Sequence, residues 1–145
     1  MMPACAAPVV ERRLVTLADW YGLAAEKLTI AAGEYRAISR EIASGRVAGV
    51  FVDGRPLFIG AVSPVGAGSS SVAWCFVAAG GIGGFSIAVV RGVRRHFEAV
   101  APFHCRVVAV VSDGNVMGQR LASLVGMVPR EAVALGFRIW ELNHG

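Results

Sequence analysis

Four glycines near the middle of the chain mark the segment best suited to bind an anion. Gly80, Gly81, Gly83 and Gly84 follow a β-branched and aromatic run and precede a stretch with helical periodicity. A glycine turn allows a ligand to approach the backbone closely, and the following helix start presents unpaired N–H groups and a positive dipole end. Such a strand–turn–helix unit suits phosphate, although a plain connection without a ligand has the same composition.

This segment matches neither of the two common nucleotide-binding motifs. No Gly-Lys-Ser/Thr follows it, so it is not a Walker loop. Position 86 is Ser86 rather than the third glycine of the dinucleotide fingerprint. The segment therefore indicates an anion site without naming the ligand.

Histidine and cysteine spacing argues against metal and disulfide chemistry. No pair of cysteines or histidines has the spacing of a metal or redox site. The residues concerned are Cys5, Cys75, Cys105, His96, His104 and His144. We therefore expect no metal, no disulfide framework and a reducing, cytoplasmic compartment. Cys75 lies in an apolar run, so we expect it to pack as a small buried hydrophobe.

Composition indicates one folded domain, residues 1–145. The chain is 55% hydrophobic and 17% charged, which excludes a disordered chain. The net charge of +4 is spread along the sequence, and its densest cluster is Arg91, Arg94 and Arg95. A solvated helix face explains that cluster better than a nucleic-acid-binding arm, which would form a block of like charge. So apolar a chain could also hide surface in a homodimer.

Residues 56–90 contain no charged side chain, and residues 72–90 are long enough to span a bilayer. The four glycines at the centre of this stretch weaken a helix by about 1 kcal/mol each. We therefore interpret the stretch as a buried strand, a turn and a helix, and we expect no membrane partner.

Hydrophobic periodicity and turn signals predict an ordered series of elements. Thr16 and Asp19 resemble a capping box, so a helix is expected to begin at Leu17 and to continue through Leu28. Asp53-Gly54 between apolar runs predicts a hairpin. The expected strands are residues 9–15, 47–52, 56–62, 72–77 and 106–111, the further helices are 33–43, 85–100 and 116–125, and residues 130–142 form one or two strands. The order predicts a mixed α/β sheet covered on both faces.

One constellation near the C-terminus is more specific. After an apolar strand come Asn115, Arg120, Leu121, Gly126 and Met127. This pattern resembles the end of a GCN5-related N-acetyltransferase (GNAT). The family's upstream signature is Arg/Gln-x-x-Gly-x-Gly/Ala, and the matching frame here is residues 78–83. The resemblance covers residues 9–142 and implies a mixed, mostly antiparallel twisted sheet in the order β-α-α-β-β-β-α-β-α-β.

The resemblance also implies a coenzyme site. The fourth strand would diverge from the fifth, and the pantetheine arm of acetyl-CoA would lie between them, bonded to the backbone of Phe76 and Val77. Asn115 would face the coenzyme from the other side, and an amine would attack the thioester directly. The implied pyrophosphate contacts are the N–H groups of Gly81, Ile82, Gly83 and Gly84, and Ala78 is the other coenzyme-binding position that the resemblance implies.

Two positions depart from the family pattern. Ala78 stands where the family usually has Arg or Gln, so one phosphate contact is missing. Ala122 stands where many members have a tyrosine that protonates the leaving thiolate. The adjacent Ser123, a poor acid, is left as the catalytic candidate.

These observations favour transfer of an acetyl group from acetyl-CoA to an amine of a small molecule or protein. The first alternative is a catalytically weak or inactive interaction protein of the same fold. A narrower resemblance to acetyltransferase-like proteins of tailed phages, including internal virion proteins, rests on residues 53–56, Trp74 and the arginines of residues 91–95. It would place the chain in a host cytoplasm or a virion. A nucleic-acid-associated module is the second alternative.

Overall fold

A single twisted sheet organises the chain. The computed structural model describes residues 7–26, 30–65, 70–100 and 106–143. Within them, seven strands lie in the order β1-β2-β3-β4-β5-β7-β6. The elements are β1 (Val10–Leu14), α1 (Leu17–Ala25), α2 (Ala32–Ala43), β2 (Ala48–Val52), β3 (Arg55–Pro64), β4 (Ser70–Val77), a 3-10 turn η1 (Gly83–Phe85), α3 (Ser86–Val100), β5 (Arg106–Ser112), α4 (Val116–Leu124), β6 (Met127–Ala134) and β7 (Phe137–Leu142).

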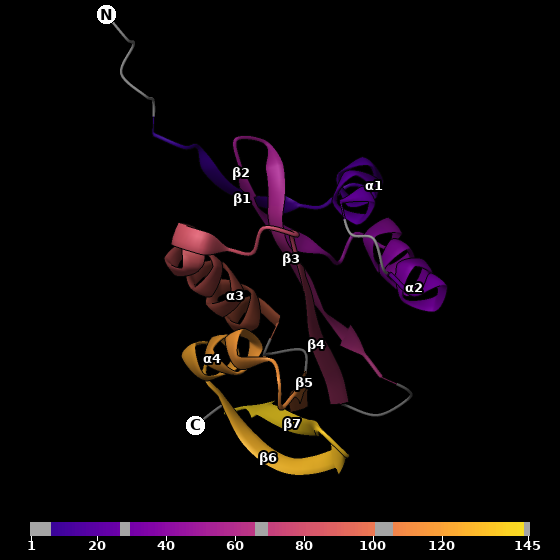
Figure 1. Ribbon diagram of the computed structural model, residues 1–145, viewed down its shortest axis with the longest axis vertical. Helices are drawn as coiled ribbons and strands as arrows, with labels where there is room; N and C mark the ends of the chain where they lie inside the picture. Colours follow the sequence, from indigo (N-terminus) through magenta and orange to yellow (C-terminus); the bar gives the residue numbers. More distant parts are fainter. Residues whose placement is uncertain (1–6, 27–29, 66–69, 101–105, 144–145) are drawn as a thin grey trace, which may run out of the picture.

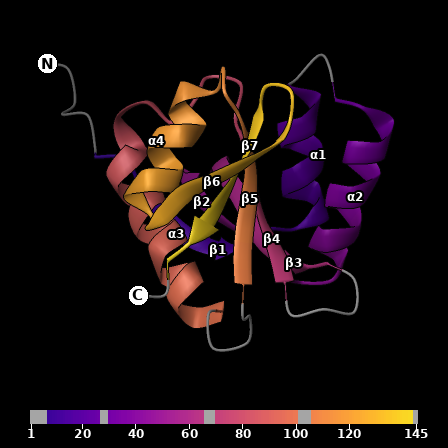
Figure 2. The same ribbon diagram turned by 90° about the horizontal axis from the view of Figure 1, so that it is seen from below.

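Helices cover both faces of this sheet. Helices α1 and α2 lie on one side, and α3 and α4 lie on the other (Figures 1 and 2). Neighbouring strands are antiparallel except for β4 and β5, which are parallel. The predicted fold class, a mixed and mostly antiparallel sheet flanked by helices, is confirmed.

The face under α1 and α2 is densely filled. Trp20, Phe51 and Ile59 are fully buried there. The Trp20 ring meets Phe76 edge to face at a centroid distance of 5.1 Å, and its Nε1 donates to Ser39 Oγ at 3.0 Å. An indole that is buried and hydrogen-bonded fixes the positions of α1, α2 and β4 relative to one another.

Two predicted turns are confirmed by their geometry. At the start of α1, Thr16 Oγ1 accepts from the Asp19 N–H, and an Asp19 carboxylate oxygen accepts from the Thr16 N–H, which completes the capping box. Between β2 and β3, Asp53 and Gly54 both have positive φ, 49° and 80°. Those angles fit a two-residue hairpin whose twist matches the sheet.

The predicted division of residues 72–90 is confirmed, since the stretch forms β4, a turn and the start of α3. No helix within the described residues is long and apolar enough to span a membrane. Other expectations need correction or refinement. The final segment forms a hairpin of two strands that begins at Met127. Cys75, expected inside, is exposed. The end of the first predicted helix, Leu28, lies outside the described residues.

Asp19 gives a stability test with a defined pH dependence. Its carboxylate accepts from Arg13 Nη1 at 2.8 Å, and this hydrogen bond, with those from Thr16, lowers the pKa of Asp19 to about 2. A carboxylate with a depressed pKa stabilises the fold fully above its ordinary pKa, and loses that effect as the pH falls towards 2. We expect Asp19→Asn to lower the free energy of unfolding by about 1–2 kcal/mol at pH 7.

Urea unfolding at pH 7, 4 and 3 measures this effect. The difference between the variant and the wild type should shrink as the pH falls. Glu98→Gln, at an exposed position of α3, is the matched control and should leave stability nearly unchanged. A difference that stays constant over the three pH values would contradict an ionic origin.

Candidate functional site

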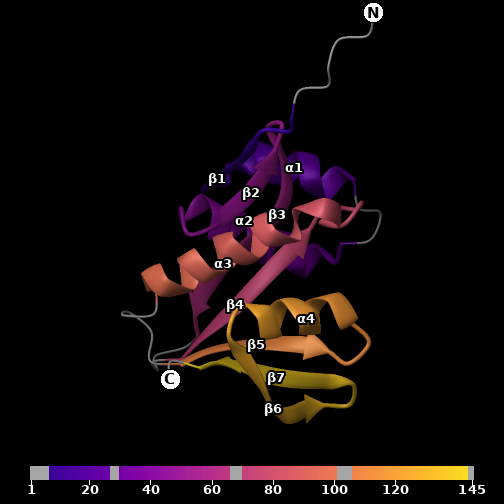
Figure 3. The same cartoon turned by 90° about the vertical axis from the view of Figure 1, so that its left-hand side faces the viewer.

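The site begins where β4 and β5 separate. They pair at only three positions, Ser70 with Arg106, Ser71 with Val107 and Val72 with Val108. Beyond Val72, β4 continues along β3, whereas β5 continues along β7. Figure 3 shows the two strands starting side by side and diverging. The sheet therefore opens towards the C-terminal ends of β4 and β5, as the resemblance implies.

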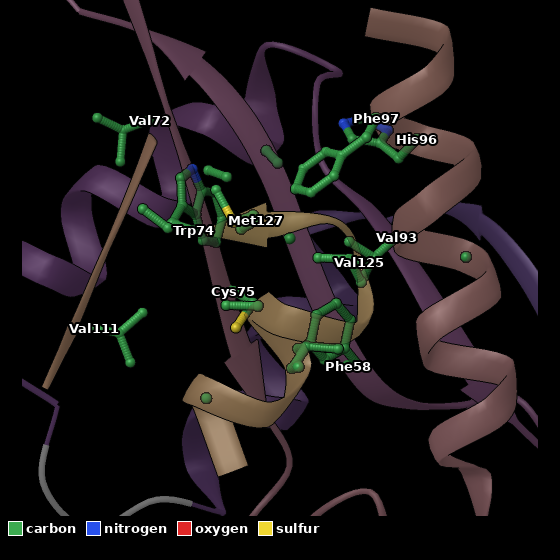
Figure 4. A pocket seen from close by; sticks show the side chains of 18 of the residues that line it. Phe58, Val72, Trp74, Cys75, Val93, His96, Phe97, Val111, Val125 and Met127 are labelled. Atoms are coloured by element: carbon green, nitrogen blue, oxygen red, sulfur yellow. The ribbon is translucent and has the colours of Figure 1, made fainter. Parts of the chain in front are cut away.

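A cavity of about 370 Å³ occupies this opening and continues between the sheet and α3 (Figure 4). That volume is in the range of small-molecule sites. The walls on β4, β5 and α4 are Val72, Ala73, Trp74, Cys75, Ala109, Val110, Val111, Ser112, Asn115, Gly118, Leu121, Ala122 and Val125, followed by Met127. The walls on β1, β2, β3 and α3 are Arg12, Ala48, Gly49, Val50, Phe58, Gly60, Ala61, Gly92, Val93, His96 and Phe97.

Small residues at the centre of the sheet create this hollow. Ala73 and Ala109 lie on β4 and β5, and Gly60 lies on β3 between the larger Phe58 and Val62. A Cβ at Gly60 would lie 2.7 Å from the Trp74 carbonyl oxygen, so β3 and β4 could not keep their spacing with any other residue there. The missing Cβ of Gly60 therefore allows β3 and β4 to keep their spacing, and it also leaves no side chain in the cavity at this position.

Helix α4 forms the wall opposite β4. Asn115 caps it, and its Oδ1 accepts from the Gly118 N–H at 2.9 Å. Asn115 lines the cavity, which is where the resemblance requires a residue facing the coenzyme. Ala122 is buried on the same wall, whereas Ser123 is exposed and is not among the lining residues. The role of Ser123 as an acid stays a prediction.

The glycine turn lies between the end of β4 and the start of α3, at the open end of the divergence (Figure 3). Gly81 and Gly83 have φ of 73° and 51°, a region that disfavours residues with a side chain. The Gly81 N–H donates to the Ala78 carbonyl at 2.8 Å, so this amide serves the turn itself. Gly83 and Gly84 open η1, and their amides therefore precede its first internal hydrogen bond.

The predicted backbone contacts lie between the cavity and this turn. Phe76 is buried on the α1–α2 face, and Val77 packs on the α3 face. The Ala78 N–H donates to the Leu57 carbonyl at 2.9 Å, which extends the β3–β4 ladder by one step. None of these three side chains lines the cavity. The N–H and C=O of Ala78 are both used within the fold, so the backbone of Phe76 and Val77 is what remains of this prediction.

The α3 wall was missed by reasoning from the sequence. Val93, His96 and Phe97 line the cavity. The helical spacing of Val93 and Phe97 indicated only core packing, and His96 was expected at the surface. The one local sign was Gly60 inside a strand, which is typical of a bulge or of a close approach. Arg94, expected on a solvated face, donates from Nε to the Leu124 carbonyl at 2.8 Å and joins α3 to α4.

Residues for a metal site are not gathered in the part of the chain that the structure describes. No group of three or more His, Cys, Asp or Glu side chains lies close enough there to hold an ion. His96 and Cys75 both line the cavity, but within the described residues neither belongs to a group of three or more such side chains.

Similarity to known proteins is found at the level of structure and not at the level of sequence. No protein-family model and no curated protein sequence matches the chain. Among solved structures, it is similar to the GNAT domain of S. lividans PAT, at 16% identity and a TM-score of 0.69 over 94% of this chain and 95% of that one.

Two further similar structures were solved with coenzyme A or its disulfide. The PaiA N-acetyltransferase of Thermoplasma acidophilum, in complex with coenzyme A, has 12% identity and a TM-score of 0.62 over 94% of this chain and 99% of that one. Mycobacterium smegmatis RimJ, in complex with CoA-disulfide, has 18% identity and a TM-score of 0.62 over 95% and 86%. The described chain therefore has the fold of the GNAT acetyltransferases.

Proposed function

We propose that this protein binds acetyl-CoA and transfers its acyl group to an amine of a small molecule or a protein. The observation that carries the proposal is the divergence of β4 and β5 over a cavity, with the glycine turn at the open end. The complexes of two similar structures with coenzyme A or its disulfide support the ligand class.

The proposed contacts follow the direction of the opening. The amides of Ile82, Gly83 and Gly84 would hold the pyrophosphate, aided by the positive end of α3. The backbone of Phe76 and Val77 would hold the pantetheine arm along β4. Asn115 would meet it from α4.

The chemistry requires an amine nitrogen to attack the thioester carbonyl carbon, after which the carbon–sulfur bond breaks and the thiolate takes a proton. Holding amine and thioester together supplies much of the rate in such a reaction. Ser123 stays the acid candidate that the sequence offers, although its side chain is exposed and lies outside the cavity lining. Its test is Ser123→Ala, which should lower kcat and leave the Kd for acetyl-CoA unchanged if the hydroxyl delivers that proton.

One observation favours the alternative of an inactive interaction protein with the same fold, whether cellular or from a tailed phage. Ala122 is buried in the cavity wall, at the position where the resemblance expects a tyrosine. That alternative predicts coenzyme binding without turnover, or no binding at all. The nucleic-acid alternative is weaker, because Arg94 is committed to Leu124 and leaves fewer guanidinium groups on that helix.

Calorimetric titration with acetyl-CoA and with free CoA tests the coenzyme site. We expect micromolar binding, and Gly83→Asp should weaken it at least tenfold, because a carboxylate there repels the pyrophosphate. Gly45→Asp is the matched control, since Gly45 has a φ of 79°, open space around it and a position outside the cavity. The control should bind as the wild type does.

The outcome that would overturn the proposal is a folded wild-type protein that binds neither ligand. Equal loss of affinity in Gly83→Asp and Gly45→Asp would also contradict it, because the effect would then come from backbone strain. If binding is present, thiol release with peptide and polyamine acceptors separates the enzyme from the inactive alternative.

Two substitutions at Asn115 separate its structural role from its proposed contact. Asn115→Ala removes the cap of α4 and should lower the free energy of unfolding by about 1 kcal/mol. Asn115→Asp keeps a capping oxygen and should leave stability unchanged, while its charge weakens coenzyme binding severalfold. Urea unfolding and calorimetry on both variants measure the two effects. Unchanged affinity in both would contradict the contact with the coenzyme.

A further inference from the structure

The cavity extends beyond the opening between β4 and β5. Its lining continues across β3 and β2 to β1, beneath α3. This part lies to one side of the path from the glycine turn into the opening. A short acyl group held at the opening would leave it empty.

The strand register shows why space exists there. Ala48 pairs with Gly60, and Gly60 pairs with Cys75, so these three residues form one row across β2, β3 and β4. Larger side chains flank the row, with Phe58 and Val50 on one side and Val62 on the other. The row is therefore a trough of small side chains, roofed by α3.

The row of small side chains ends at β1, where the larger Leu14 pairs with Ala48. A Cβ added at Gly92 of α3 would lie 3.2 Å from Arg12 Cδ and 3.3 Å from Val50 Cγ2, so helix and sheet are in contact at this point. The aliphatic stem of Arg12, which lies opposite Val50, thus closes the space between α3 and the sheet along the Val50–Phe58 side of the trough. The near end joins the opening at Cys75.

The length of the trough sets the size of its occupant. Two strand spacings of about 4.8 Å separate β4 from β2, which gives about 10 Å. An extended chain advances about 3.3–3.6 Å for every three bonds, so about eight bonds fit. The occupant must also be largely apolar, since Val50, Phe58, Val93 and Phe97 form most of the walls, and Arg12 and His96 are the polar residues among them.

We propose that the trough of Ala48, Gly60 and Cys75 holds the acyl chain of a medium-chain acyl-CoA, of about eight carbons. The inference rests on the proposed coenzyme site and deepens it, because it names the class of acyl donor. The thioester lies at the opening, and its hydrocarbon chain runs beneath α3 towards β2. An octanoyl donor then fills space that an acetyl donor leaves empty.

Calorimetric titration with free CoA, acetyl-CoA and octanoyl-CoA tests the proposal. Each buried methylene strengthens binding by up to about fourfold. We expect the Kd of octanoyl-CoA to be at least tenfold lower than that of acetyl-CoA. In Ala48→Phe, whose ring fills the far part of the trough, this advantage should disappear, while the Kd of acetyl-CoA stays within twofold of the wild type.

Matched variants keep the test decisive. Ala37→Phe makes the same change at an exposed position of α2 on the other face of the sheet, and should keep the octanoyl advantage. Ala48→Leu is the milder substitution should Ala48→Phe fail to fold, and it should reduce the advantage at least threefold.

The two proposals fail in different ways. Binding of free CoA together with equal affinities for acetyl-CoA and octanoyl-CoA overturns the medium-chain donor and leaves the coenzyme site standing. So does an octanoyl advantage that survives in the folded Ala48 variants, because the chain then lies elsewhere. Absence of binding by free CoA and by both thioesters overturns the coenzyme site itself, and the donor with it.

Discussion

The short pairing of β4 with β5 is the constraint on which the site depends. Backbone N–H and C=O groups inside a protein need partners, and a sheet normally supplies them along the whole strand. Here the ladder between the two strands ends at Val72 and Val108. The edges of β4 and β5 beyond that point face an opening instead of each other. A ligand that presents hydrogen-bonding groups along its length, such as the proposed pantetheine arm, would satisfy these edges, whereas a plain hydrocarbon would not.

One face of the sheet holds the dense core that stabilises the fold, and the other face holds the cavity. Under α1 and α2, Trp20, Phe51 and Ile59 are fully buried, so the dense core lies there. Under α3 and α4 the central positions are small, and an unfilled hollow lowers stability by leaving its lining without contacts. The fold tolerates the hollow because the helices above it are held independently. Val89 and Phe97 anchor α3 on the sheet, and the hydrogen bond from Arg94 to the Leu124 carbonyl ties α3 to α4.

Features with local causes could be predicted from the sequence, and features with distant causes could not. The capping box at Thr16, the Asp53-Gly54 hairpin and the glycine turn each depend on a few adjacent residues, and all three are where the sequence places them. Burial of Cys75 was the wrong expectation, because an apolar run indicates a strand covered on both faces, whereas the divergence from β5 exposes this side chain. The trough could not be predicted from the sequence either, because its row of residues forms only through the register of three strands.

The residues that would hold the donor differ from the residues that would supply a proton for catalysis. A correctly placed acid contributes about 10²–10⁴ to the rate of such a transfer, and it acts only on the leaving thiolate. Ala122 offers no proton, and Ser123 faces solvent rather than the cavity. Neither fact bears on the turn, the strand edges or the hollow, which are the features that would hold the donor. Affinity for the proposed coenzyme would therefore persist even if turnover were slow, so the proposed preference for an acyl chain is better measured by binding than by rate.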